Sequence, residues 1–292
     1  MYLIHEKLVK GILSSRNGMN LYRGCTHGCI YCDSRSTCYQ MDHDFEDVEV
    51  KINAPQLLEN ALKSKRKKCM IATGAMSDPY IHEEKQRGLT RACLEMIEHY
   101  GFGLAIQTKS DLILRDLDLL KSIHKNAKCV VQMTLTTYDE NLCAILEPNV
   151  CSTTRRVEVL KIMHEEGIPT IVWMTPILPF ITDTPENVRG LLNDCIQANV
   201  YGILCFNMGL TLRDGDRQYY YRQLDHYFPG LKEQYIKHYG NAYEILSPNS
   251  HILLQLVQST CKERGMICDT SALFSYMHTL EITLPKEQLS LF

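Results

Sequence analysis

Short apolar runs rich in β-branched residues alternate along most of the chain with longer segments whose apolar residues recur at the helical period. Strands are expected at residues 19–22, 69–73, 103–107, 129–135, 170–175 and 202–206. Helices are expected at residues 55–65, 84–99, 115–124, 153–166 and 185–198. Pro55 stands at a favoured first-turn position of its helix, and Ser152 is the expected N-cap of the helix at 153–166.

This alternation predicts an α/β fold with a parallel sheet. Each connection is long enough for a right-handed crossover between neighbouring parallel strands. Six β/α units are too few for a closed eight-stranded barrel, so we expect an open, partial (β/α)6 barrel, with a doubly wound sheet as the second alternative. In both folds the chemistry lies at the carboxyl ends of the strands.

The chain divides into three expected parts. The barrel domain occupies residues 1–210, a tyrosine-rich helical extension that packs on the barrel occupies 211–284, and a short tail occupies 285–292. Tyrosines and arginines are interleaved between residues 213 and 243. Such a stripe is typical of amphipathic packing with wet hydroxyl tips, but it is also compatible with stacking on nucleic-acid bases. The sequence leaves both interpretations open.

Composition restricts the class of protein. The formal net charge of −3 does not fit a protein that coats nucleic acid non-specifically, so any such contact is expected to be local. The amino-terminal segment has no apolar core of signal-peptide length, and no run approaches the roughly 18 apolar residues of a membrane span. We therefore expect a cytoplasmic protein whose 13 cysteines are reduced, and hence buried, metal-binding or catalytic.

Three of these cysteines follow the first expected strand at CxxxCxxC spacing: Cys25, Cys29 and Cys32. Gly24 and Gly28 allow the loop to wrap tightly, because glycine tolerates positive φ. Thiolates are the usual ligands of iron–sulfur clusters, and an electron-transfer ferredoxin site supplies four of them. Three ligands leave one iron of a [4Fe-4S] cluster open to bind another molecule.

Two simpler interpretations of the same cysteines remain. They can be three unrelated buried thiols, or they can belong to a zinc site that His27 or Cys38 completes. The spacing, the glycines and the position after the first strand favour the cluster, with Cys38 as a bystander thiol.

Further short motifs accompany the cysteines. They are LYRGC-THGC-IYC at 21–32, SDPY at 77–80, TR-x-CLE at 90–95, TKS-x-L-x-x-RD-x-x-LL at 108–120, LEPN at 146–149, RR at 155–156, GIP at 167–169 and PILP at 176–179. CxxxCxxC in this position resembles the signature of the radical S-adenosylmethionine (SAM) superfamily. The flanking motifs resemble its spore photoproduct lyase-like subfamily, often labelled DNA repair photolyases, over residues 10–210.

The resemblance implies a chemistry. In that superfamily the open iron chelates the amino and carboxylate groups of SAM, and a reducing flavodoxin or ferredoxin supplies the electron that cleaves it. The resulting 5′-deoxyadenosyl radical takes a hydrogen atom from the substrate, while the protein orients the cofactor and excludes water. The implied substrate is a DNA lesion. Alternatives are RNA, a peptide or a small metabolite, or a non-catalytic iron–sulfur binding module.

The resemblance also implies roles for particular residues. Tyr31 resembles the aromatic residue that flanks the adenine or the radical path, and Ser77 resembles a serine that contacts SAM. Asp78 is placed to accept from the SAM ammonium or ribose, or else to cap a turn. Lys109 resembles the lysine that pairs with the SAM carboxylate, and Thr134 occupies the place of a serine that contacts the ribose or amino group.

Two positions depart from spore photoproduct lyase itself. Ala75 stands where that enzyme has the cysteine that returns a hydrogen atom to the product radical. Asp33 stands where it has a second tyrosine of the radical path. We therefore expect this chain to use a different substrate or a different route of hydrogen return.

The carboxyl-terminal tail has a motif of its own. The last five residues are Gln288, Leu289, Ser290, Leu291 and Phe292. QLSLF resembles the peptide with which bacterial replication and repair proteins bind the β sliding clamp. Pro285 breaks the preceding structure, so the tail can present its three apolar side chains and an orienting glutamine as a linear anchor. The alternative is that the tail folds back and buries these residues on its own domain.

Overall fold

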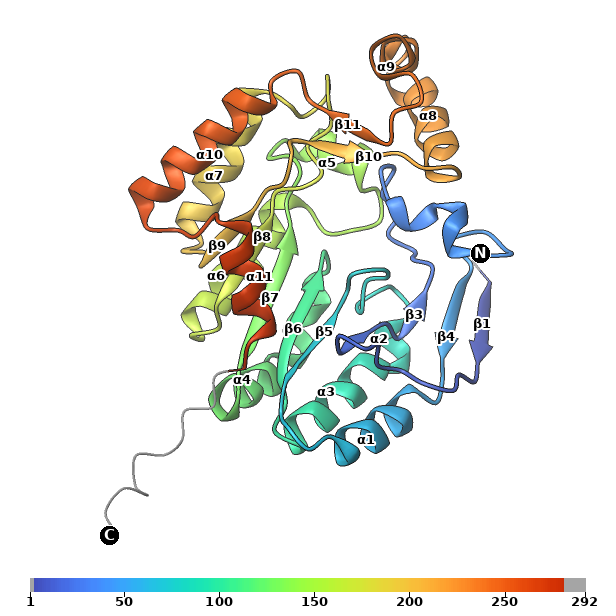
Figure 1. Ribbon diagram of the computed structural model, residues 1–292, viewed down its shortest axis with the longest axis vertical. Coiled ribbons are helices and arrows are strands. Elements are labelled where there is room, and N and C mark those ends of the chain that lie inside the picture. The colour runs from blue at the N-terminus through green and yellow to red at the C-terminus, as the bar shows by residue number, and fades with distance from the viewer. Residues whose placement is uncertain (1–2, 281–292) are drawn as a thin grey trace.

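The computed structural model describes residues 3–280, and its centre is a six-stranded parallel sheet (Figure 1). The strands are β2 (Gly18–Met19), β5 (Met70–Thr73), β6 (Gly103–Thr108), β7 (Cys129–Thr134), β8 (Thr170–Trp173) and β9 (Gly202–Leu204), in that order across the sheet. Because the order in space follows the order in sequence, there is no reversal point, which excludes the doubly wound alternative. Within residues 3–280, β2 and β9 do not pair, so the predicted partial barrel is open.

Helices cover the outer face of this sheet, as the pattern predicts. They are α1 (Ala54–Ser64), α3 (Leu89–His99), α4 (Leu117–Asn126), α6 (Thr153–Glu165) and α7 (Pro185–Gln197). Successive side chains of a strand point to opposite faces of the sheet. In β5, Ile71 packs in the hydrophobic core between the sheet and the outer helices, whereas Met70 packs on the concave face. Ser152 caps α6 as expected, because its hydroxyl accepts from the Arg155 amide at 3.2 Å.

The structure differs from the predicted elements in several places. The first expected strand is split, because the chain leaves β2 and joins a second sheet, β1-β4-β3, through β3 (Tyr22–Arg23). The other strands of that sheet are β1 (Ile4–Lys7) and β4 (Val48–Lys51). The helix expected at 84–99 breaks at Gly88, whose φ of 62° ends α2 (Glu84–Arg87) before α3 begins. The short α5 (Glu140–Leu146) was not predicted.

In the described part of the chain, three short 3₁₀ helices accompany these elements: η1 (Asp33–Arg35), η2 (Thr37–Tyr39) and η3 (Asp111–Asp116). The first two lie between the cysteine loop and β4, and the third follows β6. No helix within residues 3–280 has the length and apolar character needed to span a membrane.

The carboxyl-terminal region adds a two-stranded sheet and four helices within the described residues. They are β10 (Gly209–Thr211), α8 (Asp216–Tyr227), α9 (Leu231–Tyr239), β11 (Glu244–Leu246), α10 (Ser250–Arg264) and α11 (Thr270–His278). Helix α10 runs beside α7, and α11 lies in front of the sheet (Figure 1), where Leu273 and Met277 pack on its concave face. In the tyrosine-rich segment, Tyr220 and Tyr235 are buried and Tyr235 donates to the Pro179 carbonyl at 2.7 Å, so here the stripe serves packing.

Candidate cofactor site

A cavity of about 610 Å³ lies at the carboxyl ends of the parallel strands. Its wall combines the cysteine loop, the residues that follow β5, β6 and β9, the ends of β7 and β8, and parts of β10 and β11. This is the end of the sheet at which parallel α/β folds bind ligands, and the volume is that of a site for a small molecule or cofactor.

The cysteine loop wraps as its glycines predict. Gly24 and Gly28 have φ of 84° and 72°. A Cβ on Gly24 would lie 2.5 Å from the Phe45 carbonyl oxygen, and one on Gly28 would lie 2.9 Å from Asn149 Nδ2. A side chain at either position would therefore push the loop away from the segments against which it is held.

Cys25, Cys29 and Cys32 all line the cavity as free thiols. Burial raises the pKa of Cys25 to about 11 and that of Cys32 to about 11, and the charge of Cys25 adds to the rise at Cys32. Cys38 is exposed and lies away from the cavity wall, with its sulfur 3.7 Å from the Arg213 guanidinium. Three thiols at an open cavity fit a [4Fe-4S] cluster with one iron free of protein ligands.

The residues after β5 are tied to the cysteine loop. Ser77 is buried beside the cavity and donates to the Gly24 carbonyl at 2.5 Å. Asp78 also lines the cavity, but its Oδ1 accepts from Thr108 Oγ1 at 2.7 Å and from the Tyr80 amide at 2.8 Å. The turn-capping alternative for Asp78 is therefore seen in the structure, because this carboxylate is engaged by donors of the protein itself.

Lys109 follows β6 and reaches the same cavity. Burial lowers its pKa, but the negative charges of Cys29 and Glu147 oppose this effect and leave the pKa above its usual value. The ammonium also lies 5.8 Å from the centre of the Tyr31 ring. Lys109 is thus a half-buried cation in a cavity lined by thiols, placed to attract an anionic group of a ligand.

Thr134 and Tyr31 complete the expected set. Thr134, at the end of β7, is buried and lines the cavity, and its carbonyl accepts from Arg156 Nη1 at 2.8 Å. The Tyr31 ring lines the cavity, and its hydroxyl donates to Glu147. Burial alone would raise the pKa of Glu147, but the charges of Arg156 and Lys109 lower it below its usual value.

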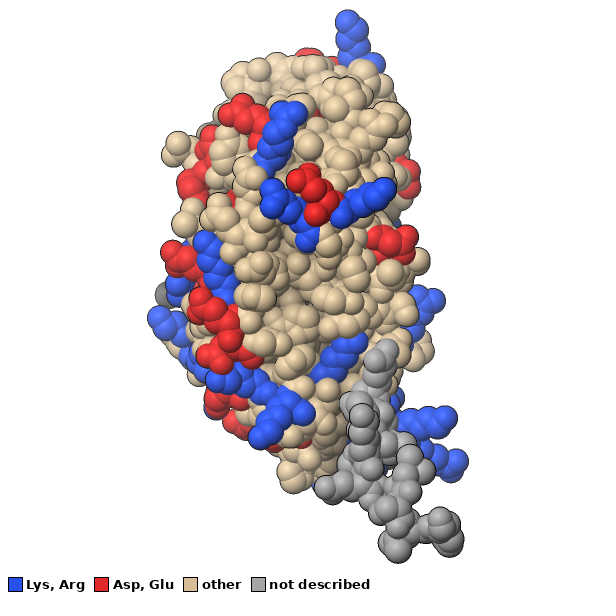
Figure 2. Space-filling model, turned by 90° about the vertical axis from the view of Figure 1, so that its left-hand side faces the viewer, with Lys and Arg blue, Asp and Glu red and all other residues tan. Residues whose placement is uncertain are grey.

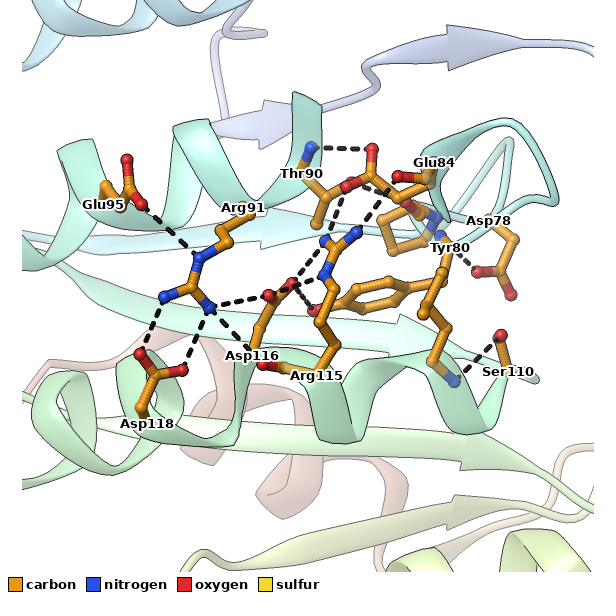
Figure 3. Close-up of polar contacts among 12 residues, drawn as sticks. Asp78, Tyr80, Glu84, Thr90, Arg91, Glu95, Ser110, Arg115, Asp116 and Asp118 are labelled. Atoms are coloured by element: carbon orange, nitrogen blue, oxygen red, sulfur yellow. Dashed lines mark hydrogen bonds and ion pairs between the residues drawn. The ribbon is translucent and has the colours of Figure 1, made fainter. Parts of the chain in front are cut away.

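A network of buried carboxylates and arginines binds Tyr80, which lies in the loop after β5 (Figure 3). Glu84 and Asp116 are fully buried. Arg115 Nη2 donates to both of them at 2.7 Å, Tyr80 donates to Asp116 at 3.1 Å, and Arg91 adds a bond of 3.0 Å to Asp116. Three separate sequence motifs, SDPY, TR-x-CLE and the RD of the fourth motif, meet in this one network.

The comparison with family models decides the identity. A model described as the radical SAM superfamily matches residues 19–194, more than half of the chain. The chain belongs to the radical SAM superfamily.

Two relatives of this chain are described as uncharacterized proteins. An uncharacterized protein of Mycobacterium tuberculosis (strain ATCC 25618 / H37Rv) is 29% identical over 246 residues, which cover 79% of this chain and 72% of that protein. An uncharacterized protein of Methanocaldococcus jannaschii is 36% identical over 167 residues, which cover 56% of this chain and 61% of that protein.

Among solved structures, this radical SAM chain is similar to spore photoproduct lyase. A complex of that enzyme with dinucleoside spore photoproduct aligns with a TM-score of 0.62 at 14% identity, covering 89% of this chain and 79% of the lyase. A variant with bound AdoMet and the same dinucleoside aligns with a TM-score of 0.63 at 14% identity, covering 89% and 79%. At this identity the likeness establishes the fold.

The radical SAM cavity has an aromatic wall that sequence reasoning missed. Trp173, at the end of β8, and Phe206, just after β9, both line it with their rings 5.8 Å apart. Phe274 of α11 lies 6.1 Å from the Trp173 ring, and Gln132 accepts from the indole at 2.8 Å. The general rule that site residues follow the strand ends could have identified Trp173, whereas its partner in α11 lies about a hundred residues away in the sequence.

The two departures from spore photoproduct lyase lie in the same place. Ala75 and Asp33 both line the cavity. No thiol therefore stands at position 75, and no phenol stands at position 33.

Proposed function

We propose that this chain binds a [4Fe-4S] cluster through Cys25, Cys29 and Cys32 and cleaves SAM reductively at its open iron, which supplies a 5′-deoxyadenosyl radical. One observation carries the proposal: the three thiols and the Lys109 ammonium face one cavity at the carboxyl end of the sheet. Thiols suit the cluster, and a half-buried cation suits the carboxylate of SAM. A reducing flavodoxin or ferredoxin is the proposed electron donor, in the cytoplasm.

The chain's own residues then have distinct tasks. Lys109 pairs with the SAM carboxylate, while Ser77 and Thr134 contact the polar groups of SAM from the ends of β5 and β7. Asp78 holds the Lys109 backbone and lines the same cavity, where it can accept from the SAM ammonium or ribose. The Tyr31 ring forms the part of the wall that touches the cofactor.

For the substrate, we propose a lesion in DNA or another nucleic acid. Support comes from the structurally similar spore photoproduct lyase, whose structures hold a dinucleoside lesion. Contact with the polymer would be local: on the face shown in Figure 2, basic and acidic side chains are interspersed and form no broad basic band. Arg217 is also unsuited to phosphate binding, because it donates to the carbonyls of Leu212 at 2.7 Å and Ala242 at 2.6 Å.

The tail Gln288–Phe292 lies outside the described residues, and we propose that it binds a bacterial β sliding clamp. A tether of this kind raises the effective concentration of the enzyme on DNA, which suits a chain with a net charge of −3. Calorimetry with a purified clamp tests it. Binding by the full chain, lost when residues 288–292 are deleted, supports the tether, and equal binding by both proteins contradicts it.

RNA, a peptide or a small metabolite is the alternative substrate class, and a non-catalytic iron–sulfur module is the alternative to an enzyme. To test the DNA substrate, reconstituted protein, SAM and dithionite are incubated with ultraviolet-irradiated or unirradiated oligonucleotide. A rise in 5′-deoxyadenosine, together with altered lesion bases, only with irradiated DNA supports the proposal. Stimulation by neither oligonucleotide contradicts it and favours the other substrate classes.

A further inference from the structure

The segment 146–149 is docked along the cysteine loop. The Ile30 amide donates to the Leu146 carbonyl at 3.0 Å. Asn149 donates through its backbone amide to the His27 carbonyl at 3.2 Å and through Nδ2 to the Thr26 carbonyl at 3.1 Å. The loop that carries the three cysteines is thus bound along its length by a segment more than a hundred residues away.

Glu147 is the charged member of this segment, and it is completely enclosed. Its side chain and that of Arg156 are both 0% exposed, and Arg156 Nη2 forms an ion pair with Glu147 Oε2. The other carboxylate oxygen, Oε1, accepts from the Tyr31 hydroxyl. Arg156 is fixed in turn, because its Nη1 donates to the Thr134 carbonyl at the end of β7.

This arrangement sets the direction of the Tyr31 O–H bond. A carboxylate in an ion pair with arginine has no proton to donate, so the hydrogen between Tyr31 and Glu147 belongs to the phenol. A buried charged acceptor makes a strong hydrogen bond that is costly to break. The hydroxyl hydrogen therefore points at Glu147, while Tyr31 lines the cavity with its ring centre 5.8 Å from the Lys109 ammonium.

We infer that Glu147, held by Arg156, is a positioning residue that fixes Tyr31 as a wall of the cofactor cavity and withholds its hydroxyl hydrogen from that cavity. Tyr31 then contacts the cofactor through its ring and does not return the hydrogen atom. Because Ala75 also has no thiol, the hydrogen atom is returned by a group other than residues 31 and 75.

The first test needs no cluster. Unfolding of the metal-free protein by urea is measured for Tyr31→Phe, Glu147→Gln and the double variant, as a double-mutant cycle. We expect the effect of Tyr31→Phe on the unfolding equilibrium constant to differ by at least about five-fold between the wild-type and Glu147→Gln backgrounds. A difference of this size lies within the range found for residues of one hydrogen-bond network. Tyr22→Phe with Glu84→Gln is the matched control, because Tyr22 donates to buried Glu84 at 2.5 Å away from the cavity.

If Glu147→Gln does not fold because Arg156 is left unpaired, Glu147→Gln is combined with Arg156→Met as one change, which strands no buried charge. The coupling of Tyr31→Phe to this combined change is then measured. Additive effects of Tyr31→Phe and Glu147→Gln, with coupling in the Tyr22 control, would overturn the inference.

The second test rests on the proposed function. SAM is cleaved without substrate in deuterated buffer, where the Tyr31 hydroxyl carries deuterium, and the deuterium content of each 5′-deoxyadenosine is measured by mass spectrometry. Donation by Tyr31 would transfer that deuterium to C5′ and leave a tyrosyl radical. We expect the same deuterium content per molecule in wild type and Tyr31→Phe, whatever the two rates.

A loss of deuterium in Tyr31→Phe alone, with Tyr22→Phe unchanged, would contradict the inference. Absence of 5′-deoxyadenosine from every protein would instead contradict the proposed function, and the coupling between Tyr31 and Glu147 would still decide the inference.

Discussion

The backbone amide of Lys109 donates a hydrogen bond of 2.8 Å to Oδ2 of Asp78. This bond joins the segment after β6 to the segment after β5, and Thr108 reinforces it through Oδ1 of the same carboxylate at 2.7 Å. His27 Nδ1 lies 3.5 Å from Oδ2, and burial lowers the pKa of His27, so it faces Asp78 as a neutral ring. Asp78 therefore places the lysine at the cavity, which gives the first prediction.

Asp78→Asn should weaken SAM binding through the position of Lys109. The carboxylate of Asp78 accepts from the Lys109 amide, the Thr108 hydroxyl and the Tyr80 amide. The NH2 group of asparagine is a donor and cannot accept, so at least one of these bonds is lost and the segment that carries Lys109 is held less firmly. Losing one such bond costs about 1–3 kcal/mol. Calorimetry with SAM on the reconstituted protein measures the loss of affinity, and an unchanged dissociation constant would show that this bond does not position Lys109.

Lys109→Ala should weaken SAM binding more directly, because the SAM carboxylate loses its charged partner. A contact of this kind contributes roughly 1.5–3 kcal/mol, which corresponds to about a ten- to hundred-fold change in affinity. Lys125→Ala, at an exposed position of α4, is the control for loss of a positive charge. Equal affinity in wild type and Lys109→Ala would place the SAM carboxylate elsewhere.

Arg115→Met should destabilise the metal-free protein by about 3 kcal/mol, because it leaves the buried carboxylates of Glu84 and Asp116 short of a cation. Arg87→Met is the matched control: Arg87 pairs with the half-exposed Glu6 at 2.8 Å, and an exposed pair contributes about 0–1 kcal/mol. Urea unfolding of both variants checks this. Similar midpoints for the two would show that the network behind SDPY contributes little stability.

The protein should not convert spore photoproduct to two thymidines at the rate of a lyase, because Ala75 leaves position 75 without a hydrogen donor. Chromatography of a dinucleoside spore photoproduct reaction with SAM and dithionite measures this. Ala75→Cys restores a thiol at the cavity wall and is the informative variant. Efficient conversion by the unaltered chain would require a donor outside position 75.

The sequence predicted the repeating part of the fold well, because strands buried on both faces, such as 129–134, and helices with one apolar face have distinct periods. It did not predict the break at Gly88, since a single glycine is tolerated within a helical pattern. It also did not predict α5, because a helix of 7 residues is too short to show the helical period clearly. The CxxxCxxC spacing predicted without three-dimensional information that Cys25, Cys29 and Cys32 lie together, because the three residues are close in the sequence, and all three line the cavity.

The rest of the site depends on contacts between distant segments. The LEPN and RR motifs contain Glu147 and Arg156, but nothing in the sequence says that these two pair with each other or that Tyr31 joins them. The same holds for Asp78, whose bonds to Thr108 and to the Lys109 amide join segments about thirty residues apart in the sequence. Trp173 and Phe274 meet only because α11 returns to the concave face of the sheet.

The most direct test of the central claim is cleavage of SAM by the reconstituted protein. After anaerobic loading with iron and sulfide, wild type and Cys38→Ala should hold a [4Fe-4S] cluster and, with dithionite, release 5′-deoxyadenosine from SAM. Cys29→Ala should hold little iron and release none, because only two of the three cavity thiols remain. A full cluster in Cys29→Ala, or a loaded wild-type cluster that releases no 5′-deoxyadenosine, would contradict the account.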